Sequence, residues 1–172
     1  VLPASVSGGR VALPLNASNV DLAEWLGALQ PTWYSAGPTL HLAVLEKAQL
    51  RPDTRAMHSL RFISSAGAPL AADVHERMQT VLGVPVMEHY GSSETAQIST
   101  NLPSPGRSRP GTCGIPAPDT VRIVGEDGHQ LPAGERGEIL VRTPSVMSGY
   151  LNAPELNRSA FVDGWFRTGD IG

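Results

Sequence analysis

A run of seven residues near the middle of the chain combines the side chains that a nucleotide site needs. The run is His89-Tyr90-Gly91-Ser92-Ser93-Glu94-Thr95, and it follows an apolar stretch. An aromatic ring can stack on a base, and a glycine lets the backbone approach a ligand closely. Hydroxyls can donate to phosphate oxygens, and a carboxylate can bind Mg²⁺ together with phosphates. A strand-to-helix turn with serine caps uses the same residue types, so the run alone favours neither interpretation.

A second polar cluster, Arg167-Thr168-Gly169-Asp170, lies near the end of the sequence. Its carboxylate could accept hydrogen bonds from both hydroxyls of a ribose, as acidic residues do in dinucleotide sites. A turn aspartate is the commoner explanation of so short a motif.

A third interpretation of the central run, a serine-hydrolase elbow, needs glycine two residues after the nucleophile. Thr95 stands there instead, which disfavours that chemistry.

The segments before the central run predict a parallel βαβ unit. We expect a strand over 60–65, a tight turn over 66–69, a helix over 71–82 and a second strand over 84–90. Strand–helix–strand alternation is typical of parallel sheets, and ligands of such sheets bind at the carboxyl ends of the strands. The turn and the central run both fall at that edge.

Upstream, the pattern predicts an amphipathic helix over 21–30, a short strand over 32–36 and a helix over 38–48. After residue 101 the composition changes to a loop rich in proline, glycine and serine. Short strands over 120–124 and 137–142, separated by glycine-containing turns, then indicate an antiparallel subdomain, barrel-like in character.

We therefore expect an α/β fold in which a parallel βαβ sheet layer (1–101) is followed by a small antiparallel β-barrel-like subdomain (102–172). A short helix is predicted from Asn152, as its N-cap, to about Phe161. His58 and His75 are expected at the surface.

Composition limits the possible partners. The formal net charge is −3 and no basic stripe is present, which argues against nucleic acid. The single cysteine, Cys113, excludes an internal disulfide framework. No apolar stretch approaches the roughly 20 residues that span a bilayer, so a cytoplasmic setting is predicted. The chain begins at Val1 and stops just after a polar cluster, so we expect a piece of a longer protein whose remaining N- and C-terminal portions complete it.

Four motifs occur in a fixed order along the chain. They are Ser65-Ala66-Gly67-Ala68-Pro69-Leu70, Tyr90-Gly91-Ser92-Ser93-Glu94, Gly137-Glu138-Ile139-Leu140-Val141-Arg142 and Gly164-Trp165-Phe166-Arg167-Thr168-Gly169-Asp170. Together they resemble the adenylate-forming superfamily, which includes acyl-CoA synthetases, adenylation domains of peptide synthetases and luciferase-like ligases. The segments 31–39 and 164–172 are most similar to the acyl-CoA synthetase branch, in particular oxalate–CoA and medium- or long-chain acyl-CoA ligases.

The resemblance implies a role for each residue of the site. The residues that would contact ATP or AMP are Gly67, Ala68, Pro69, Glu88, His89, Tyr90, Gly91, Ser92, Ser93 and Asp170. Tyr90 would stack on adenine, with Glu88 near the amino group of the base, and Asp170 would hold the ribose hydroxyls. Ser93, at the phosphate, and Glu94, on Mg²⁺, would be the catalytic residues. The pocket for the carboxylate substrate would be lined by Ser35, Ala66 and His89.

The reaction implied by the resemblance has two steps. A small-molecule carboxylate attacks the α-phosphate of ATP, giving acyl-AMP and pyrophosphate. A thiol of coenzyme A, or of a phosphopantetheine carrier arm, then takes the acyl group. The family's phosphate loop and lysine-bearing C-terminal domain are absent from these residues, so the chain alone is expected to be inactive. Two alternatives stay open: a ligase that loads a carrier protein, and a non-catalytic nucleotide-binding or assembly module.

Overall fold

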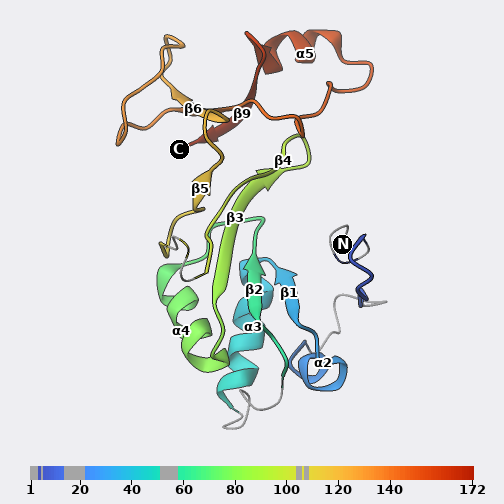
Figure 1. Cartoon of the computed structure of the whole chain (residues 1–172). Helices are drawn as coiled ribbons and strands as arrows, with labels where there is room; N and C mark the ends of the chain where they lie inside the picture. The colour runs from blue at the N-terminus through green and yellow to red at the C-terminus, as the bar shows by residue number, and fades with distance from the viewer. Residues whose placement is uncertain (1–3, 5, 14–21, 51–57, 104–105, 107–108) are drawn as a thin grey trace.

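The computed structural model describes residues 4, 6–13, 22–50, 58–103, 106 and 109–172. Its strands form two sheets, one of five strands in the order β1-β2-β3-β4-β5 and one of four strands in the order β6-β7-β9-β8. Figure 1 shows the two sheets in different parts of the molecule, with the long strands β3 and β4 running between them. The predicted α/β fold, a parallel layer followed by an antiparallel subdomain, is confirmed.

The five-stranded sheet is parallel on one side and antiparallel on the other. Its strands are β1 (Trp33–Ala36), β2 (Phe62–Ser65), β3 (Val86–Ser92), β4 (Ala96–Thr100) and β5 (Ile115–Pro116). The first three strands are parallel, whereas β4 pairs antiparallel with β3, and β5 with β4. The predicted subdomain boundary after residue 101 stays a prediction. Strand β5 lies beyond residue 101 in sequence but belongs to this sheet.

The four-stranded sheet is antiparallel throughout. Its strands are β6 (Val121–Val124), β7 (Glu138–Val141), β8 (Phe161–Val162) and β9 (Trp165–Ile171). The short helix α5 (Pro154–Ala160) leads into β8. The expected N-cap, Asn152, is wrong: Ala153 holds that position and Asn152 has a positive φ of 55°. Pro154 sets the start of the helix, since proline is well suited to the first helical position.

Three helices accompany the five-stranded sheet: α2 (Leu22–Leu29), α3 (Pro38–Gln49) and α4 (Ala72–Leu82). As predicted, α3 begins with proline, and α4 ends at a left-handed Gly83 whose φ is 71°. No helix in the described ranges is both long and apolar enough to cross a membrane.

The two faces of the parallel strands have different surroundings. Tyr34, Ile63 and Val86 belong to the buried core, which they share with apolar residues of all three helices. Because side chains alternate along a strand, the intervening residues of β1, β2 and β3 point to the opposite face. That second face carries Trp33 and Phe62, which are paired partners in the sheet.

His75 corrects an expectation. It was predicted at the surface but is buried, with 1% of its area exposed, and its Nε2 lies 3.1 Å from the carbonyl oxygen of Val86. Positions 75, 78 and 82 lie on one face of α4, as the i, i+3, i+7 spacing requires. The imidazole therefore belongs to the same buried stripe as Met78 and Leu82.

A second buried imidazole, His41, should make stability depend on pH. Its side chain is fully buried, its Nδ1 lies 3.2 Å from the hydroxyl oxygen of Tyr34, and burial lowers its pKa to about 4. Between that value and the ordinary pKa of about 6.5, the unfolded state binds more protons than the folded state, so acid favours unfolding. We expect His41 alone to contribute a loss of about 3 kcal/mol as pH falls from 7 to 4.

Urea denaturation at pH 7 and pH 4 checks this expectation. His41→Gln should reduce the pH dependence of the unfolding free energy, whereas His129→Gln, at an exposed histidine, should leave it unchanged. An identical pH dependence in wild type and His41→Gln would contradict the assignment.

Candidate functional site

The central run does not end at a helix but forms a β-hairpin. Strand β3 continues through Tyr90 to Ser92 and turns into β4, with Ser92 paired to Ala96. The register shifts between Tyr90 and Gly91, so a bulge lies within the run. Bulges re-aim side chains and are common next to functional sites. The site therefore lies where β3 leaves the parallel sheet.

Gly91 is required by the hairpin itself. A Cβ atom at this position would lie 2.1 Å from the carbonyl oxygen of Ala96 on the facing strand. No side chain fits at that distance, so any L-residue larger than glycine would push the strands apart. The glycine thus has a structural explanation that is independent of a ligand.

The two polar clusters of the sequence meet in space. The hydroxyl of Tyr90 donates a hydrogen bond of 2.5 Å to Oδ2 of Asp170, and the two residues are 80 positions apart. Burial, together with this bond to a carboxylate, raises the pKa of Tyr90 to about 12. Tyr90 is half-buried and Asp170 is exposed. An aromatic ring and a carboxylate are therefore joined at one accessible place between β3 and β9.

Glu94, at the tip of the hairpin, is held by a segment of the second subdomain. Its Oε1 accepts a bond of 3.1 Å from the hydroxyl of Tyr150, and its carbonyl oxygen accepts one of 2.7 Å from the N–H of Met147. Hydrogen bonds from the Ser92 hydroxyl, the backbone N–H and Tyr150 hold the pKa of Glu94 below its usual value. The carboxylate is consequently ionised at neutral pH.

The two serines of the run have different surroundings. The Ser92 hydroxyl lies 3.1 Å from Oγ1 of Thr95 and accepts a bond of 3.2 Å from the N–H of Glu94. It therefore helps to fix the turn. Ser93 is exposed at the tip, beside Glu94.

The turn 66–69 lies next to this hairpin. Ser65 and Glu88 are paired partners in β2 and β3, so Ala66 and His89, which follow this pair, lie at the same level of the sheet. Gly67 has a φ of 88°, and Gly67, Ala68 and Pro69 are all exposed. Open space surrounds the position that a Cβ of Gly67 would take.

Glu88 is buried and engaged in structure. The residue is 6% exposed, and its carboxylate accepts a bond of 3.3 Å from the N–H of Gly111 and lies 3.9 Å from Nε2 of His75. A contact between Glu88 and a base stays a prediction. The side chain has a further role that the sequence did not indicate, which is to support the loop 109–114.

Two polar side chains of the hairpin region fix the same loop. Buried Asn101 donates to the carbonyl oxygen of Thr112 at 2.5 Å and accepts from the N–H of Arg109 at 3.0 Å. Ser99 donates to the carbonyl oxygen of Cys113 at 2.9 Å. Ser99 is the paired partner of Tyr90, so the loop 109–114 is fixed close to the aromatic ring.

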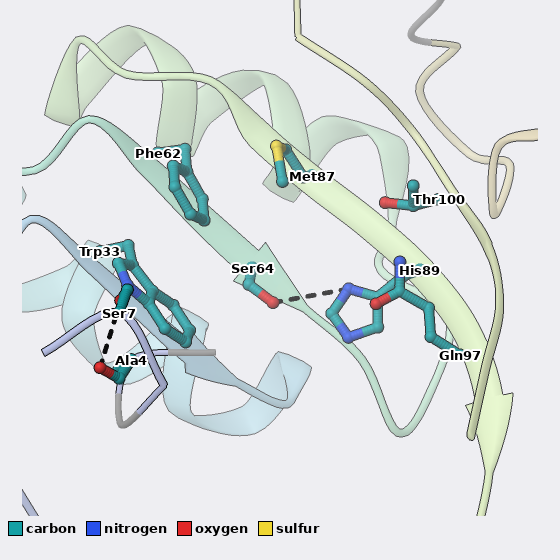
Figure 2. Close-up of a pocket in the computed structure, with 9 residues that line it drawn as sticks. All are labelled: Ala4, Ser7, Trp33, Phe62, Ser64, Met87, His89, Gln97 and Thr100. Atoms are coloured by element: carbon teal, nitrogen blue, oxygen red, sulfur yellow. Dashed lines mark hydrogen bonds between the residues drawn. The ribbon is translucent and has the colours of Figure 1, made fainter. Parts of the chain in front are cut away.

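A pocket of about 290 Å³ occupies the second face of the sheet. Figure 2 shows its lining, in which His89 lies beside Ser64 and Trp33 lies near Phe62. The lining residues are Ala4, Ser7, Trp33, Phe62, Ser64, Met87, His89, Gln97 and Thr100. The pocket runs from the first residues of β1 and β2 to the β3–β4 hairpin.

The three residues predicted to line the acid pocket, His89, Ser35 and Ala66, differ in their position relative to this cavity. His89 lines it, and burial lowers the pKa of its imidazole. Ser35 does not line the cavity itself, but its Oγ lies 3.1 Å from Oγ of Ser64, which does. The Oγ of Ser64 lies 3.4 Å from Nδ1 of His89. Ala66 follows the end of β2, outside the described lining.

The sequence interpretation included Trp33 among the side chains that set the pocket size but missed Phe62, Met87 and Tyr150. Phe62 and Met87 could have been found from strand periodicity, because each alternates with a core residue of the same strand. Tyr150 had no comparable signal, since it lies 56 positions from its partner Glu94.

Among the residues that the structure describes, no three His, Cys, Asp or Glu side chains gather as a metal site. Glu94 is nevertheless an ionised, partly exposed carboxylate beside serine hydroxyls. Such a donor suits Mg²⁺, which is held by one or two carboxylates together with water and substrate phosphates.

The comparisons with known proteins agree with this geometry. The family model described as "AMP-binding enzyme" matches residues 1–151. The chain therefore belongs to the family of AMP-binding enzymes.

Its relatives include CoA ligases. The chain is 36% identical to the oxalate–CoA ligase of Arabidopsis thaliana and covers 33% of that protein with 96% of its own length. It is 37% identical to the sulfoacetate–CoA ligase of Cupriavidus necator, with 97% of the chain covering 32% of the relative. Among solved structures, the anthranilate CoA ligase AuaEII in complex with anthranoyl-AMP has a TM-score of 0.83 at 27% identity, with 95% of this chain matching 32% of that one. The chain thus spans about a third of the length of these relatives.

The close approach at Gly91 gives a direct test of the hairpin. Gly91→Ala should lower the free energy of unfolding by about 1–3 kcal/mol, the usual range for overpacking. Gly37→Ala is the control, because a Cβ there would meet only Ala66 at an ordinary 3.5 Å. Thermal unfolding of both variants measures the difference, and equal stability of the two would contradict the steric argument.

Proposed function

We propose that this chain provides the adenosine-binding side of an ATP-dependent carboxylate ligase of the acid–thiol type. The observation that carries the proposal is the hydrogen bond between Tyr90 and Asp170. It brings together a flat ring and a carboxylate, the two groups that can recognise a base and a ribose. Membership of the AMP-binding family supports the same ligand.

The nucleoside would lie between the hairpin and the turn 66–69. Tyr90 would stack on adenine, with Gly67 and Ala68 against the other face and Pro69 closing the turn. Asp170 would accept hydrogen bonds from the ribose hydroxyls. Its present bond to Tyr90 supports this role, because the hydroxyl donor holds the carboxylate at the edge of the ring.

The phosphates would lie toward the tip of the hairpin. Ser93 is exposed there and could donate its hydroxyl to a phosphate oxygen. Glu94 would hold Mg²⁺, and Tyr150 would keep its carboxylate oriented. When bound, the metal would neutralise phosphate charge during the displacement. Gly91 and Ser92 would maintain the turn that carries both residues.

The acid would enter the pocket beside His89. Its carboxylate would attack the α-phosphate, giving acyl-AMP and pyrophosphate, and a thiol would then take the acyl group and release AMP. Catalysis of this kind depends on positioning the reactants in line and on stabilising charge. In this proposal Tyr90 and Asp170 fix the nucleotide, while the pocket fixes the acid.

Coenzyme A is the proposed acceptor, because relatives that match nearly the whole chain are named CoA ligases. A phosphopantetheine arm on a carrier protein offers the same thiol chemistry. A cytoplasmic setting is part of the proposal and rests on the sequence.

The role of Asp170 can be tested by titrating the chain with AMP and following the Tyr90 ring signals by NMR. Asp170→Asn should weaken AMP binding by about tenfold or more, since hydrogen bonds to a charged group contribute about 1.5–3 kcal/mol. Asp163→Asn is the matched control at another exposed aspartate. Equal affinities of wild type and Asp170→Asn would sink the ribose assignment.

A second expectation concerns turnover. The 172 residues alone should release no carboxylate-dependent pyrophosphate, because the resemblance assigns the phosphate loop and the catalytic lysine to other segments. A coupled pyrophosphate assay with a panel of acids measures this, and robust release would show that these residues suffice for catalysis.

A further inference from the structure

The pocket on the second face of the sheet has a different chemical character at each of its two ends. One end is formed by Trp33 and Phe62, whose rings stack with centroids 5.7 Å apart and planes inclined by 12°. Met87 lies on the next strand and extends this apolar wall (Figure 2). A thioether is soft and adapts to irregular apolar ligands.

The other end is polar. His89, Gln97 and Thr100 line it, and Ser64 joins it through the contact with Nδ1 of His89. Because burial lowers the pKa of His89, its imidazole is neutral at physiological pH. The lining at this end therefore offers hydrogen bonds from uncharged groups.

The polar end is the one that adjoins the proposed nucleotide site. His89 immediately precedes Tyr90, and its level in the sheet corresponds to that of Ala66, one residue beyond the pair Ser65–Glu88. Ser64, whose hydroxyl contacts the His89 imidazole, lies two residues after Phe62 on β2, which is roughly 7 Å at the rise of a β-strand. A carboxylate beside His89 would thus direct its body toward the Trp33–Phe62 wall.

From this arrangement we infer that the pocket selects monocarboxylic acids with an extended, uncharged, apolar body, such as arylalkanoic or medium-chain fatty acids. The inference rests on the proposed function and deepens it, since it names the substrate class of the same site. Trp33, Phe62 and Met87 are its specificity-determining residues.

A second negative charge on the acid would be poorly accommodated. None of the described lining residues is a lysine or arginine that could pair with it, and an anion that loses its water without a paired partner is strongly destabilised. A very short acid would reach only the polar end. The relatives named oxalate–CoA ligase and sulfoacetate–CoA ligase act on short acids with two anionic groups, so this chain should differ from them in substrate.

The inference can be tested on the chain by binding alone, with the Met87 methyl group as the probe. The protein is labelled with ¹³C at its methionine methyls, the Met87 signal is assigned with Met87→Leu, and the sample is titrated with octanoate, phenylacetate, glutarate and malonate. Saturable shifts of the Met87 signal with octanoate and phenylacetate, at concentrations where the two diacids cause none, are the expected result.

A charge-introducing variant sharpens the test. Phe62→Lys places a cation on the apolar wall and should weaken octanoate binding by about tenfold or more, because the apolar contact is lost. The same variant should gain affinity for glutarate. Leu50→Lys, at a residue that is 83% exposed, is the control and should bind both acids like wild type.

Each outcome has one meaning. Diacids that shift Met87 as readily as octanoate would overturn the inferred substrate class. A Met87 signal that responds to none of the four acids would overturn the pocket as an acid-binding site. Neither result bears on the AMP titration, which reads Tyr90 and Asp170, so the proposed function and this inference can fail separately.

Discussion

The hairpin of β3 and β4 is the connection on which the rest of the structure depends. Its strands begin in the parallel sheet and end at a tip that is bonded to residues 145–150 of the second subdomain. Gly91 permits the strands to approach, and Tyr90, at the bulge beside it, bonds to Asp170. The hairpin therefore carries Tyr90 and Glu94 and brings Tyr90 into contact with Asp170 of β9, in the other sheet.

Much of the fold could be predicted from local sequence. Proline at the start of α3, glycine at the end of α4 and the apolar runs of β2 and β3 each act within a few residues. These signals suffice for the βαβ unit and for the edge of the sheet where Tyr90 lies. The order of the four motifs then indicated the family.

Other features depend on contacts that no local pattern encodes. The strand β9 pairs with β7, which is distant in sequence, and the bond from the Thr168 hydroxyl to the carbonyl oxygen of Ile139 spans 29 positions. Without that partner, the sequence of β9 resembled a polar turn. His75 is polar by type, but its position on the inner stripe of α4 decides its burial. The pocket was only partly predicted, because the strands were treated as equally buried on both faces. In the structure one face packs on the core and the other lines the pocket.

The bond between Tyr90 and Asp170 has a consequence for folding. Its two ends belong to different sheets and are separated by 80 positions, so the pair exists only when both sheets have formed. A ligand that contacts both residues binds the folded chain and not the unfolded one, and such a ligand stabilises the fold in proportion to the logarithm of its concentration. For the proposed nucleotide, the free energy of unfolding of the chain would therefore rise with nucleotide concentration.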